Sequence, residues 1–435
     1  MANQVSRRTF VGGAAAATSL AGVSGTRALL SEAHGESRLP SPSKSGIEHV
    51  IVVMMENRSF DHLLGWMPRA NGKQAGLTYV DKSGIAHPTY HLTDYQNCGL
   101  ADPDHSYAGG HTQYDGGKCD GWLRAGTGDL FPIGYYGVRD LSFLSQAAPE
   151  WTVCDNYFAG ILAPTYPNRF YQHAAQTDRL DDSTTISTLP AIWDRLAAAG
   201  LTGRYYYSDI PFTALWGSKY LDISRPFGEF LGACETGLLP QFSYVDPRFE
   251  DESSGTSDDD HPHADIRNGE AFLNEVYTAV TQSPAWPKTV LIINFDEWGG
   301  FYDHVPPPRK AIPSGDKAAG GDGRLGFRVP ALVISPFARR KYIATEQFDH
   351  TSVLKLVEWR WNLDPLTVRD AGANNLASIL NFAEPVLAAP QYSVPVGPFG
   401  GACTEAVTGN VPGDNEDTEW VAIKALAEQH GFTLP

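Results

Sequence analysis

The sequence has few cysteines, and those it has are widely spaced. Only five occur among its 435 residues. They are Cys98, Cys119, Cys154, Cys234 and Cys403. None forms a CxxC pair or another close spacing typical of metal ligands, so the sequence offers no cysteine-based metal site. The odd number leaves at least one thiol unpaired within a monomer, and pairing of the others stays open.

Positive charge is also scarce. Lysine and arginine together number 33, against 50 aspartates and glutamates, which gives a formal net charge of −17. A chain with this balance lacks the basic face that binding to nucleic acid or to an anionic bilayer requires. We therefore expect no nucleic-acid partner. If a lipid is bound, electrostatic attraction is not what brings it to the protein.

Long hydrophobic runs are absent as well. The apolar run Val11–Gly25 is rich in glycine and alanine, and it is too short and too mild to span a membrane permanently. It follows a twin-arginine pattern, SRRTFV, at Ser6–Val11. We therefore expect residues 1–40 to be a signal segment and linker, and the twin-arginine export machinery to be a partner. The protein is then secreted or located in the periplasm or cell envelope, with no stable membrane span.

Residues 46–435 have the alternation of strands and helices expected of a single α/β domain with long loop insertions. The expected strands are 47–55, 151–158, 203–207, 241–245, 289–295 and 329–334. The expected helices are 60–67, 141–148, 170–176, 189–199, 264–281, 350–361, 370–382 and 419–430. Residues 70–137 have little periodicity, which predicts a long ordered loop region. The economical architecture is an α/β/α sandwich around a mostly parallel sheet.

The apolar run Ile47–Met55 is rich in β-branched residues, which predicts a buried strand of a parallel sheet. It stops at Glu56 and Asn57, and Ser59 is a residue type that begins helices. Glu56 and Asn57 thus lie where a strand ends and a helix begins, which is where ligands bind in open α/β sheets. They offer oxygen ligands for a divalent cation, although a solvated Glu and a capping Asn would give the same pattern.

Further polar groups are expected at the same sheet edge. Thr165 lies just ahead of a helix with Pro167 in its first turn, where free N–H groups favour an anion. Asp296 and Glu297 directly follow the apolar strand 289–295. With Glu56 and Asn57 these groups would form an oxygen-rich site for a divalent ion, which lowers the pKa of a coordinated hydroxyl. This chemistry suggests attack by Thr165 on a phosphorus centre.

Histidines would supply proton transfer. The candidates are His105, in an aromatic loop, and His261 and His304, which flank acidic or Pro/Gly turns. For each of them taken alone, a structural role is the commoner explanation. We expect structural roles for His49, His62, His173 and His350. The acidic run Asp258–Asp260 is expected to be a solvated loop, with calcium binding as the alternative.

Three strings carry a resemblance to a known family. They are ENRSFDH at Glu56–His62, PTYPNR at Pro164–Arg169 and FDEWGGFYDHVPP at Phe295–Pro307. In this order they closely resemble the bacterial phosphoesterase family, which holds secreted phosphatidylcholine-type phospholipases C and some acid phosphatases. The resemblance extends over about residues 46–380 and implies an alkaline-phosphatase-like α/β fold.

The resemblance also implies roles for the residues at the sheet edge. One divalent metal ion would be held by Glu56, Asn57, Thr165, Asp296 and Glu297. Thr165 would be the nucleophile, and His105 and His261 would contact the phosphate or move protons. His304 is a further catalytic candidate, whose role stays open. Oxygen ligands suit calcium, magnesium or manganese, whereas participating histidines would favour zinc.

The function implied is that of an exported metal-dependent phospholipase C. It would hydrolyse the glycerol-side phosphodiester of phosphatidylcholine-type lipids through a phosphothreonine intermediate. An acid phosphatase acting on phosphomonoesters is the nearest alternative, and a secreted binding protein without turnover is another. A choline headgroup favours aromatic faces, and ordinary packing is the alternative role for each ring. The candidate rings are Tyr107, Trp122, Tyr135, Tyr136 and Tyr205–Tyr207.

Overall fold

The computed structural model describes residues 39–127, 129–250, 254–403 and 416–435. The expected signal segment therefore lies outside the described residues, apart from its last two positions. An eight-stranded sheet forms the centre, in the order β13-β6-β12-β11-β1-β10-β8-β9. Its strands are β1 (His49–Met55), β6 (Thr152–Cys154), β8 (Gly203–Tyr207), β9 (Ser224–Pro226), β10 (Phe242–Val245), β11 (Thr289–Phe295), β12 (Ala331–Ile334) and β13 (Tyr342–Ala344).

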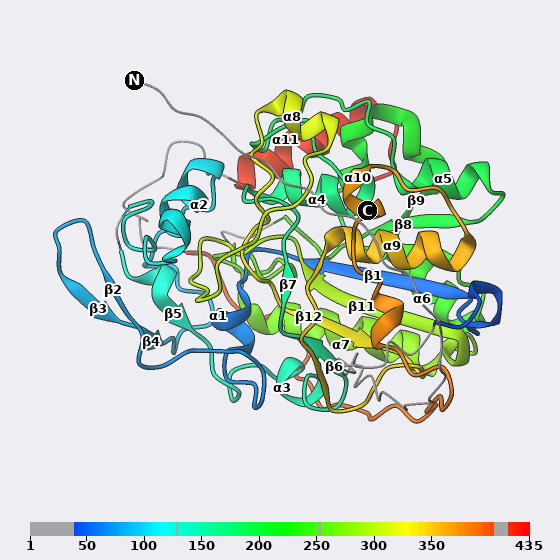
Figure 1. Cartoon of the computed structure of the whole chain (residues 1–435), viewed down its shortest axis with the longest axis horizontal. Coiled ribbons are helices and arrows are strands. Elements are labelled where there is room, and N and C mark those ends of the chain that lie inside the picture. Colours follow the sequence, from blue (N-terminus) through cyan, green and yellow to red (C-terminus); the bar gives the residue numbers. More distant parts are fainter. Residues whose placement is uncertain (1–38, 128, 251–253, 404–415) are drawn as a thin grey trace, which may run out of the picture. The chain divides into compact units, whose positions relative to one another are not determined.

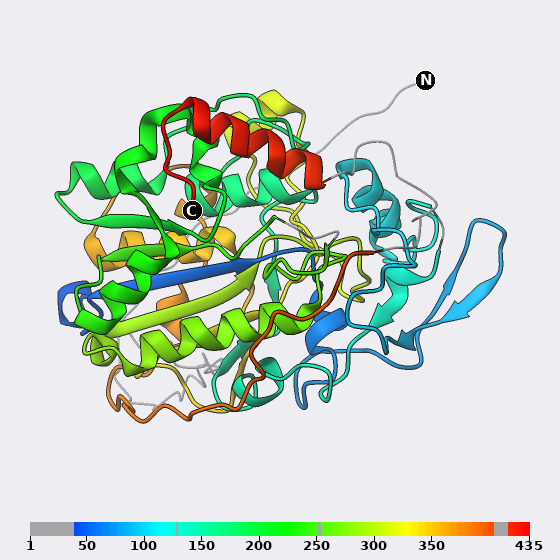
Figure 2. The same ribbon diagram turned by 180° about the vertical axis from the view of Figure 1, so that it is seen from behind.

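Only β12 runs against its neighbours in this sheet, and the other pairings are parallel. Helices cover both faces, with α4 (Thr165–Ala174) and α9 (His350–Trp361) on one and α7 (Ile266–Gln282) on the other (Figures 1 and 2). The predicted α/β/α sandwich around a mostly parallel sheet is therefore confirmed. Within the described part of the chain, no helix has both the length and the apolar character needed to cross a bilayer.

The remaining helices and short strands lie around this sandwich. The other α-helices are α1 (Phe60–Leu64), α2 (Tyr107–Tyr114), α3 (Leu144–Ala147), α5 (Ile192–Ala198), α6 (Phe227–Thr236), α8 (Ser314–Ala319), α10 (Val368–Ala371) and α11 (Glu416–Gln429). The short strands are β2 (Thr78–Val80), β3 (Ala86–Pro88), β4 (Tyr90–His91), β5 (Gly134–Tyr135), β7 (Tyr157–Phe158) and β14 (Phe348–Asp349). The 3₁₀ helices are η1 (Pro42–Lys44), η2 (Asp115–Gly117), η3 (Phe131–Ile133), η4 (Phe212–Ile223), η6 (Trp286–Lys288) and η7 (Leu376–Ile379).

Strand β1 is the central strand that positions the site. Its residues from Val50 to Met55 are fully buried, since β10 and β11 pair with it on both sides and helices cover both faces. The chain then turns into α1, where the Ser59 hydroxyl accepts the N–H of His62 at 3.2 Å. The predicted strand and the predicted N-cap are both confirmed. The ends of the parallel strands accordingly lie on the side of α1 and α2 (Figure 1).

Three element predictions were wrong in part. Residues 70–137 contain a small hairpin, β2–β3, and the eight-residue helix α2, so the region is not one long loop. The expected strand 151–158 divides into β6 and β7, which belong to different sheets. In place of the expected helix 370–382 the structure has the single turn α10, which begins at Val368. Asp370 accepts the N–H of Thr367 in a capping box at the start of this turn, and Gly372 follows its end.

One disulfide connects distant parts of the chain. Cys98 and Cys403 are bonded across 305 residues, and the thiols of Cys119, Cys154 and Cys234 are free and buried. The amide of Gln96 donates to the carbonyl of Gly401 at 2.6 Å beside this disulfide. The bond thereby fastens the segment before His105 to the segment after the last sheet strand, and the prediction of at least one unpaired thiol is confirmed.

Glu358 of α9 makes the stability of the fold depend on pH. Its side chain is buried, and burial raises its pKa from 4.5 to about 9, with Asp370 of α10 adding to the shift. The folded state thus keeps a proton that the unfolded chain loses at lower pH. The free energy of unfolding therefore decreases as the pH rises through the range between these two pKa values.

The variant Glu358→Gln is expected to unfold at a higher temperature than wild type at about pH 9 and at a similar temperature at about pH 4.5. The reason is that glutamine stays neutral at every pH. Thermal unfolding followed by circular dichroism across this range measures the difference. Glu229→Gln, at a side chain that is 60% exposed, is the control. A pH-independent offset between wild type and Glu358→Gln would contradict the prediction.

Candidate active site

The ends of three neighbouring parallel strands bring carboxylates together at one sheet edge. Glu56 follows β1, Asp246 follows β10, and Asp296 with Glu297 follows β11. All four side chains are fully buried. A backbone hydrogen bond joins the ends of β1 and β11, in which the N–H of Asp296 donates to the carbonyl of Met55 at 3.0 Å. Glu56, Asp296 and Glu297 therefore lie at the same sheet edge, as predicted.

Asn57 joins this group to Thr165. The hydroxyl of Thr165, the first residue of α4, donates to Oδ1 of Asn57 at 3.3 Å. The backbone N–H of Asn57 donates to Oδ1 of Asp296 at 3.1 Å, and the N–H of Glu297 donates to the same oxygen at 2.6 Å. Gly299 must be glycine, because its φ is +62° and a Cβ there would lie 2.0 Å from the Asn57 carbonyl oxygen.

Arg169, one turn into α4, lies among the carboxylates. Its guanidinium forms ion pairs with Asp246 at 2.7 Å, Glu56 at 3.0 Å and Asp296 at 3.3 Å. Burial alone lowers the pKa of Arg169, but these carboxylates outweigh it and raise the pKa well above its usual value. Burial also raises the pKa of Asp246 to about 6, against the opposing effect of Arg169. Arg169 therefore stays charged.

The chemistry of this group fits a divalent cation. Three buried carboxylates pair with one guanidinium and a fourth, Glu297, is buried at the same sheet edge, and each buried ion costs several kcal/mol of desolvation unless opposite charge offsets it. Glu56, Asn57, Asp296 and Glu297 present carboxylate and amide oxygens, the donors that hard divalent ions prefer. The Thr165 hydroxyl lies beside them through Asn57. Asn57 links Thr165 to Asp296 and Arg169 links Asp296 to Glu56, while the Glu297 side chain accepts the N–H of Gly299, so binding of a metal ion by all five residues stays a prediction.

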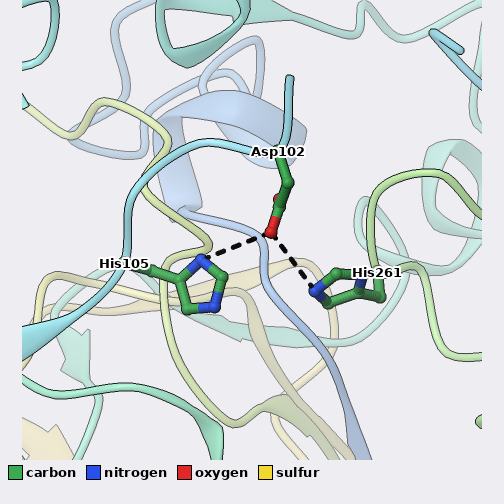
Figure 3. A group of neighbouring side chains, drawn as sticks. All are labelled: Asp102, His105 and His261. Carbon is green, nitrogen blue, oxygen red and sulfur yellow. Dashed lines mark ion pairs between the residues drawn. The ribbon is translucent and has the colours of Figure 1, made fainter. Parts of the chain in front are cut away.

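Two histidines flank a carboxylate next to this cluster (Figure 3). Oδ2 of Asp102 lies 3.9 Å from Nδ1 of His105 and 3.8 Å from Nε2 of His261. Nδ1 of His105 also lies 2.8 Å from the Pro103 carbonyl, which fixes the proton on Nδ1. Its Nε2 then accepts from the Asn57 amide at 3.5 Å. The predicted residues His105 and His261 are therefore connected to Thr165, through Asp102 and Asn57.

His304 contacts a different set of side chains. Its Nδ1 lies 2.5 Å from Oδ2 of Asp61, and its Nε2 lies 3.1 Å from Oδ1 of Asn71. Arg328, which is fully buried, pairs with Asp61 at 3.2 Å and with Asp303 at 2.9 Å. These contacts hold the loop after β11 against α1. A catalytic role for His304 stays a prediction that none of these contacts supports.

The histidines predicted to be structural are buried or bound to the backbone. Burial lowers the pKa of His173 to about 3 and that of His350 to about 4. Burial and the neighbouring Arg58 place the pKa of His62 well below its ordinary value. Nδ1 of His49 contacts the carbonyl of Pro240 at 2.9 Å. Three of these rings are therefore neutral at ordinary pH, in keeping with structural roles.

The expected solvated loop at Asp258–Asp260 is largely buried. Asp259 is fully buried and Asp260 is 2% exposed. Oδ1 of Asp259 accepts the N–H of His261 at 3.0 Å, and the Asp259 carbonyl accepts the N–H of Glu56 at 2.8 Å. These hydrogen bonds take the place of water around the polar groups of the loop. Arg58 adds another, because its Nε donates to the Asp260 carbonyl at 2.7 Å. The loop therefore positions His261 beside the end of β1.

The sequence did not identify Arg169, Asp246 or Asp102 as members of the site. Asp246 directly follows a predicted strand, as Glu56 does, so its position at the end of a strand indicates the same sheet edge. Arg169 lies inside a quoted string, PTYPNR, four residues after Thr165, which places it one helical turn away. Asp102 carried no comparable signal.

The chain is similar to known phosphoesterases and phospholipases C. The sequence matches the Phosphoesterase family over residues 47–364. It is 32% identical to Non-specific phospholipase C1 of Arabidopsis thaliana, over 78% of this chain and 71% of the relative. It is 31% identical to Phospholipase C B of Mycobacterium tuberculosis, over 88% of this chain and 86% of the relative. A solved structure from Vibrio parahaemolyticus in the alkaline phosphatase superfamily aligns with a TM-score of 0.38 at 11% identity, over 77% of this chain and 72% of that one.

Proposed function

Since the chain belongs to the phosphoesterase family and is a hydrolase of phosphoric ester bonds, we propose that it is an exported, metal-dependent phospholipase C. Its substrates are phosphatidylcholine-type lipids, cleaved at the glycerol side of the phosphodiester. The observation that carries the proposal is the cluster in which the Thr165 hydroxyl, Asn57 and buried carboxylates meet at one sheet edge. The two relatives reported above are also named phospholipases C.

Thr165 is the nucleophile in the proposed reaction. A divalent cation held by Glu56, Asn57, Asp296, Glu297 and the Thr165 oxygen would lower the pKa of that hydroxyl and offset phosphoryl charge. Thr165 is the first residue of α4, so the positive end of the helix dipole also favours the phosphoryl oxygens, with the N–H of Tyr166 already donating to Oδ1 of Asp182 at 2.6 Å. The Oγ1–phosphorus bond forms as the bond from phosphorus to the glycerol oxygen breaks, which leaves a phosphothreonine diester.

The two histidines move the protons. Nε2 of His105, which carries no proton, contacts the Asn57 amide, and Asn57 in turn contacts Thr165, so we assign to His105 the role of taking the hydroxyl proton. His261 donates a proton to the departing glycerol oxygen, which releases diacylglycerol. It then takes a proton from the water that attacks phosphorus, and the bond from phosphorus to Thr165 breaks as His105 returns its proton to the Thr165 oxygen. The headgroup leaves as its phosphate monoester, and Asp102 between the rings stabilises whichever histidine is charged.

Most of the aromatic rings considered for a choline headgroup do not line a binding surface. Trp122 and Tyr136 are fully buried, and Tyr205–Tyr207 are at most 3% exposed. Their rings pack in the core or bond to other side chains, as Tyr205 does to Asp246. For this set burial favours the alternative of ordinary packing, and Tyr107 and Tyr135, which are partly exposed, remain the candidates for a choline headgroup.

Release of phosphocholine from phosphatidylcholine vesicles is expected from the purified protein, and chelation should abolish it. Adding back calcium, magnesium, manganese or zinc, one at a time, should restore it with the ion that the site binds. Phosphate release from a generic monoester is measured in parallel. Phosphate release alone would contradict the phospholipase C proposal in favour of a phosphatase, and silence on both substrates would favour a binding protein without turnover.

A further inference from the structure

The guanidinium of Arg169 is buried. Its three nitrogens contact three carboxylates and one backbone carbonyl. Its Nη1 pairs with Asp246 at 2.7 Å, its Nη2 with Glu56 at 3.0 Å and its Nε with Asp296 at 3.3 Å. The same Nη2 donates to the carbonyl of Met54 at 3.4 Å. The planar fork of an arginine matches several carboxylates at once, which a lysine ammonium cannot do.

The faces of the guanidinium are covered as well. The Arg169 carbon Cζ lies 4.7 Å from the centre of the Phe249 ring, and Trp420 of α11 stacks on Phe249 at 3.8 Å. Cation–π contacts of this kind strengthen when water is excluded. The orientation of Arg169 is therefore fixed by the last helix of the chain as well as by the sheet.

Asp246 anchors Arg169 and is itself held in place. The hydroxyl of Tyr205, in β8, donates to Oδ2 of Asp246, leaving Oδ1 for Arg169. The Tyr205 oxygen in turn accepts the N–H of Phe212 at 2.9 Å. A chain of bonds thus runs from the backbone of η4 through Tyr205 and Asp246 to Arg169.

We propose that Arg169 is a positioning residue, which orients one oxygen of Glu56 and one of Asp296 so that their carboxylates receive the divalent ion in a fixed arrangement. This inference rests on the proposed function, because it concerns the same metal site. Removing a residue that orients a metal ligand without contacting the metal itself typically weakens metal binding by about 10- to 100-fold. Arg169 also supplies positive charge that lets four buried carboxylates coexist before the ion binds.

The decisive measurement is the affinity of chelator-treated protein for Mn²⁺, Ca²⁺, Mg²⁺ and Zn²⁺ by isothermal titration calorimetry. For the ion that wild type binds best, Arg169→Lys should raise Kd by about 10- to 100-fold, since lysine keeps the charge but loses the fork. Its activity should return toward the wild-type kcat at high metal concentration. That recovery distinguishes a positioning residue from one that takes part in the chemistry.

Arg369→Lys is the matched control. Arg369 is also buried, but its guanidinium donates to the Tyr171 hydroxyl at 3.0 Å and to the Gly160 carbonyl, and neither partner is a proposed metal ligand. Its Kd for the ion should stay close to wild type. An equal loss of affinity in both variants would overturn the inference, because it would reflect general loosening of the fold.

Tyr205→Phe keeps the test decisive if Arg169→Lys does not fold. It removes only the hydroxyl that holds Asp246, and it should weaken metal binding by a smaller factor in the same direction. If whichever of the two variants folds binds the metal ion as tightly as wild type or more tightly, Arg169 is not a positioning residue. The proposed function is not affected by that result. If wild type binds none of the four ions, the proposed function and the inference both fail.

Discussion

Replacing Thr165 by alanine is expected to lower kcat on phosphatidylcholine by at least about 10³-fold, since removal of a nucleophile eliminates the covalent route. The hydroxyl of Thr165 is 3.3 Å from Oδ1 of Asn57, and the residue is 1% exposed. Thr165→Ser should keep much of the activity, because it keeps the hydroxyl. Steady-state assays with saturating metal measure both variants.

A phosphoryl group on Thr165 is the second expected result of the same chemistry. Rapid acid quenching of wild type during turnover should give a peptide containing Thr165 with the mass of the headgroup phosphate added, and Thr165→Ala should give none. Thr177→Ala is the control, because Thr177 is another fully buried threonine, whose hydroxyl bonds to the carbonyl of Arg179. Near-normal turnover by metal-loaded Thr165→Ala would show that the covalent mechanism is wrong.

The fold was predictable where burial leaves a simple pattern in the sequence. Strand β11 begins and ends at the residues expected, because a strand with neighbours on both sides and helices on both faces must be apolar throughout. Helix α9 also begins and ends where expected, since Asp349 caps it and the segment is long. Short elements such as α10 were not predictable, because the capping box at Thr367 overrides the helical periodicity that follows.

The site was predictable to the extent that its residues follow strands. Glu56 and Asp296 each end an apolar run, and parallel strands bring such ends together. Asp102 and His261 lie on loops far apart in the sequence, and only the folded chain places them 3.8 Å apart. Arg169 points inward from a helix rather than from a strand end, so no rule about sheet edges applied to it.

Exposure was the property that the sequence predicted least well. Asp259 lies in an acidic run, and such runs are usually solvated, yet its carboxylate is buried because it bonds to the N–H of His261 and the hydroxyl of Ser257. Trp122 lies in a glycine-rich segment but is fully buried, with its ring 4.6 Å from Phe327. The Asp259 carbonyl also accepts the N–H of Glu56 at 2.8 Å, so in both cases a partner distant in the sequence contributes to burial, and local composition does not report it.

Replacing His261 by asparagine is expected to reduce kcat on phosphatidylcholine by about 10²- to 10⁴-fold, the usual contribution of a general acid. The glycerol oxygen is a poor leaving group without a proton. A nitrophenyl ester of phosphocholine needs no such proton, because nitrophenolate leaves readily on its own. Its first turnover by His261→Asn should therefore stay close to the wild-type rate, followed by slow hydrolysis of the phosphothreonine, since His261 also activates the water.

Rapid mixing resolves this burst, and His105→Asn supplies the comparison. His105 is the proposed base for Thr165, so its loss should slow the first turnover on both substrates alike. His91→Asn, at a side chain that is 46% exposed and pairs with Asp140 at 2.7 Å, should leave both rates unchanged. Equal slowing of the two first turnovers in His261→Asn would contradict an acid role, because a residue that only shapes the site cannot distinguish leaving groups by their basicity.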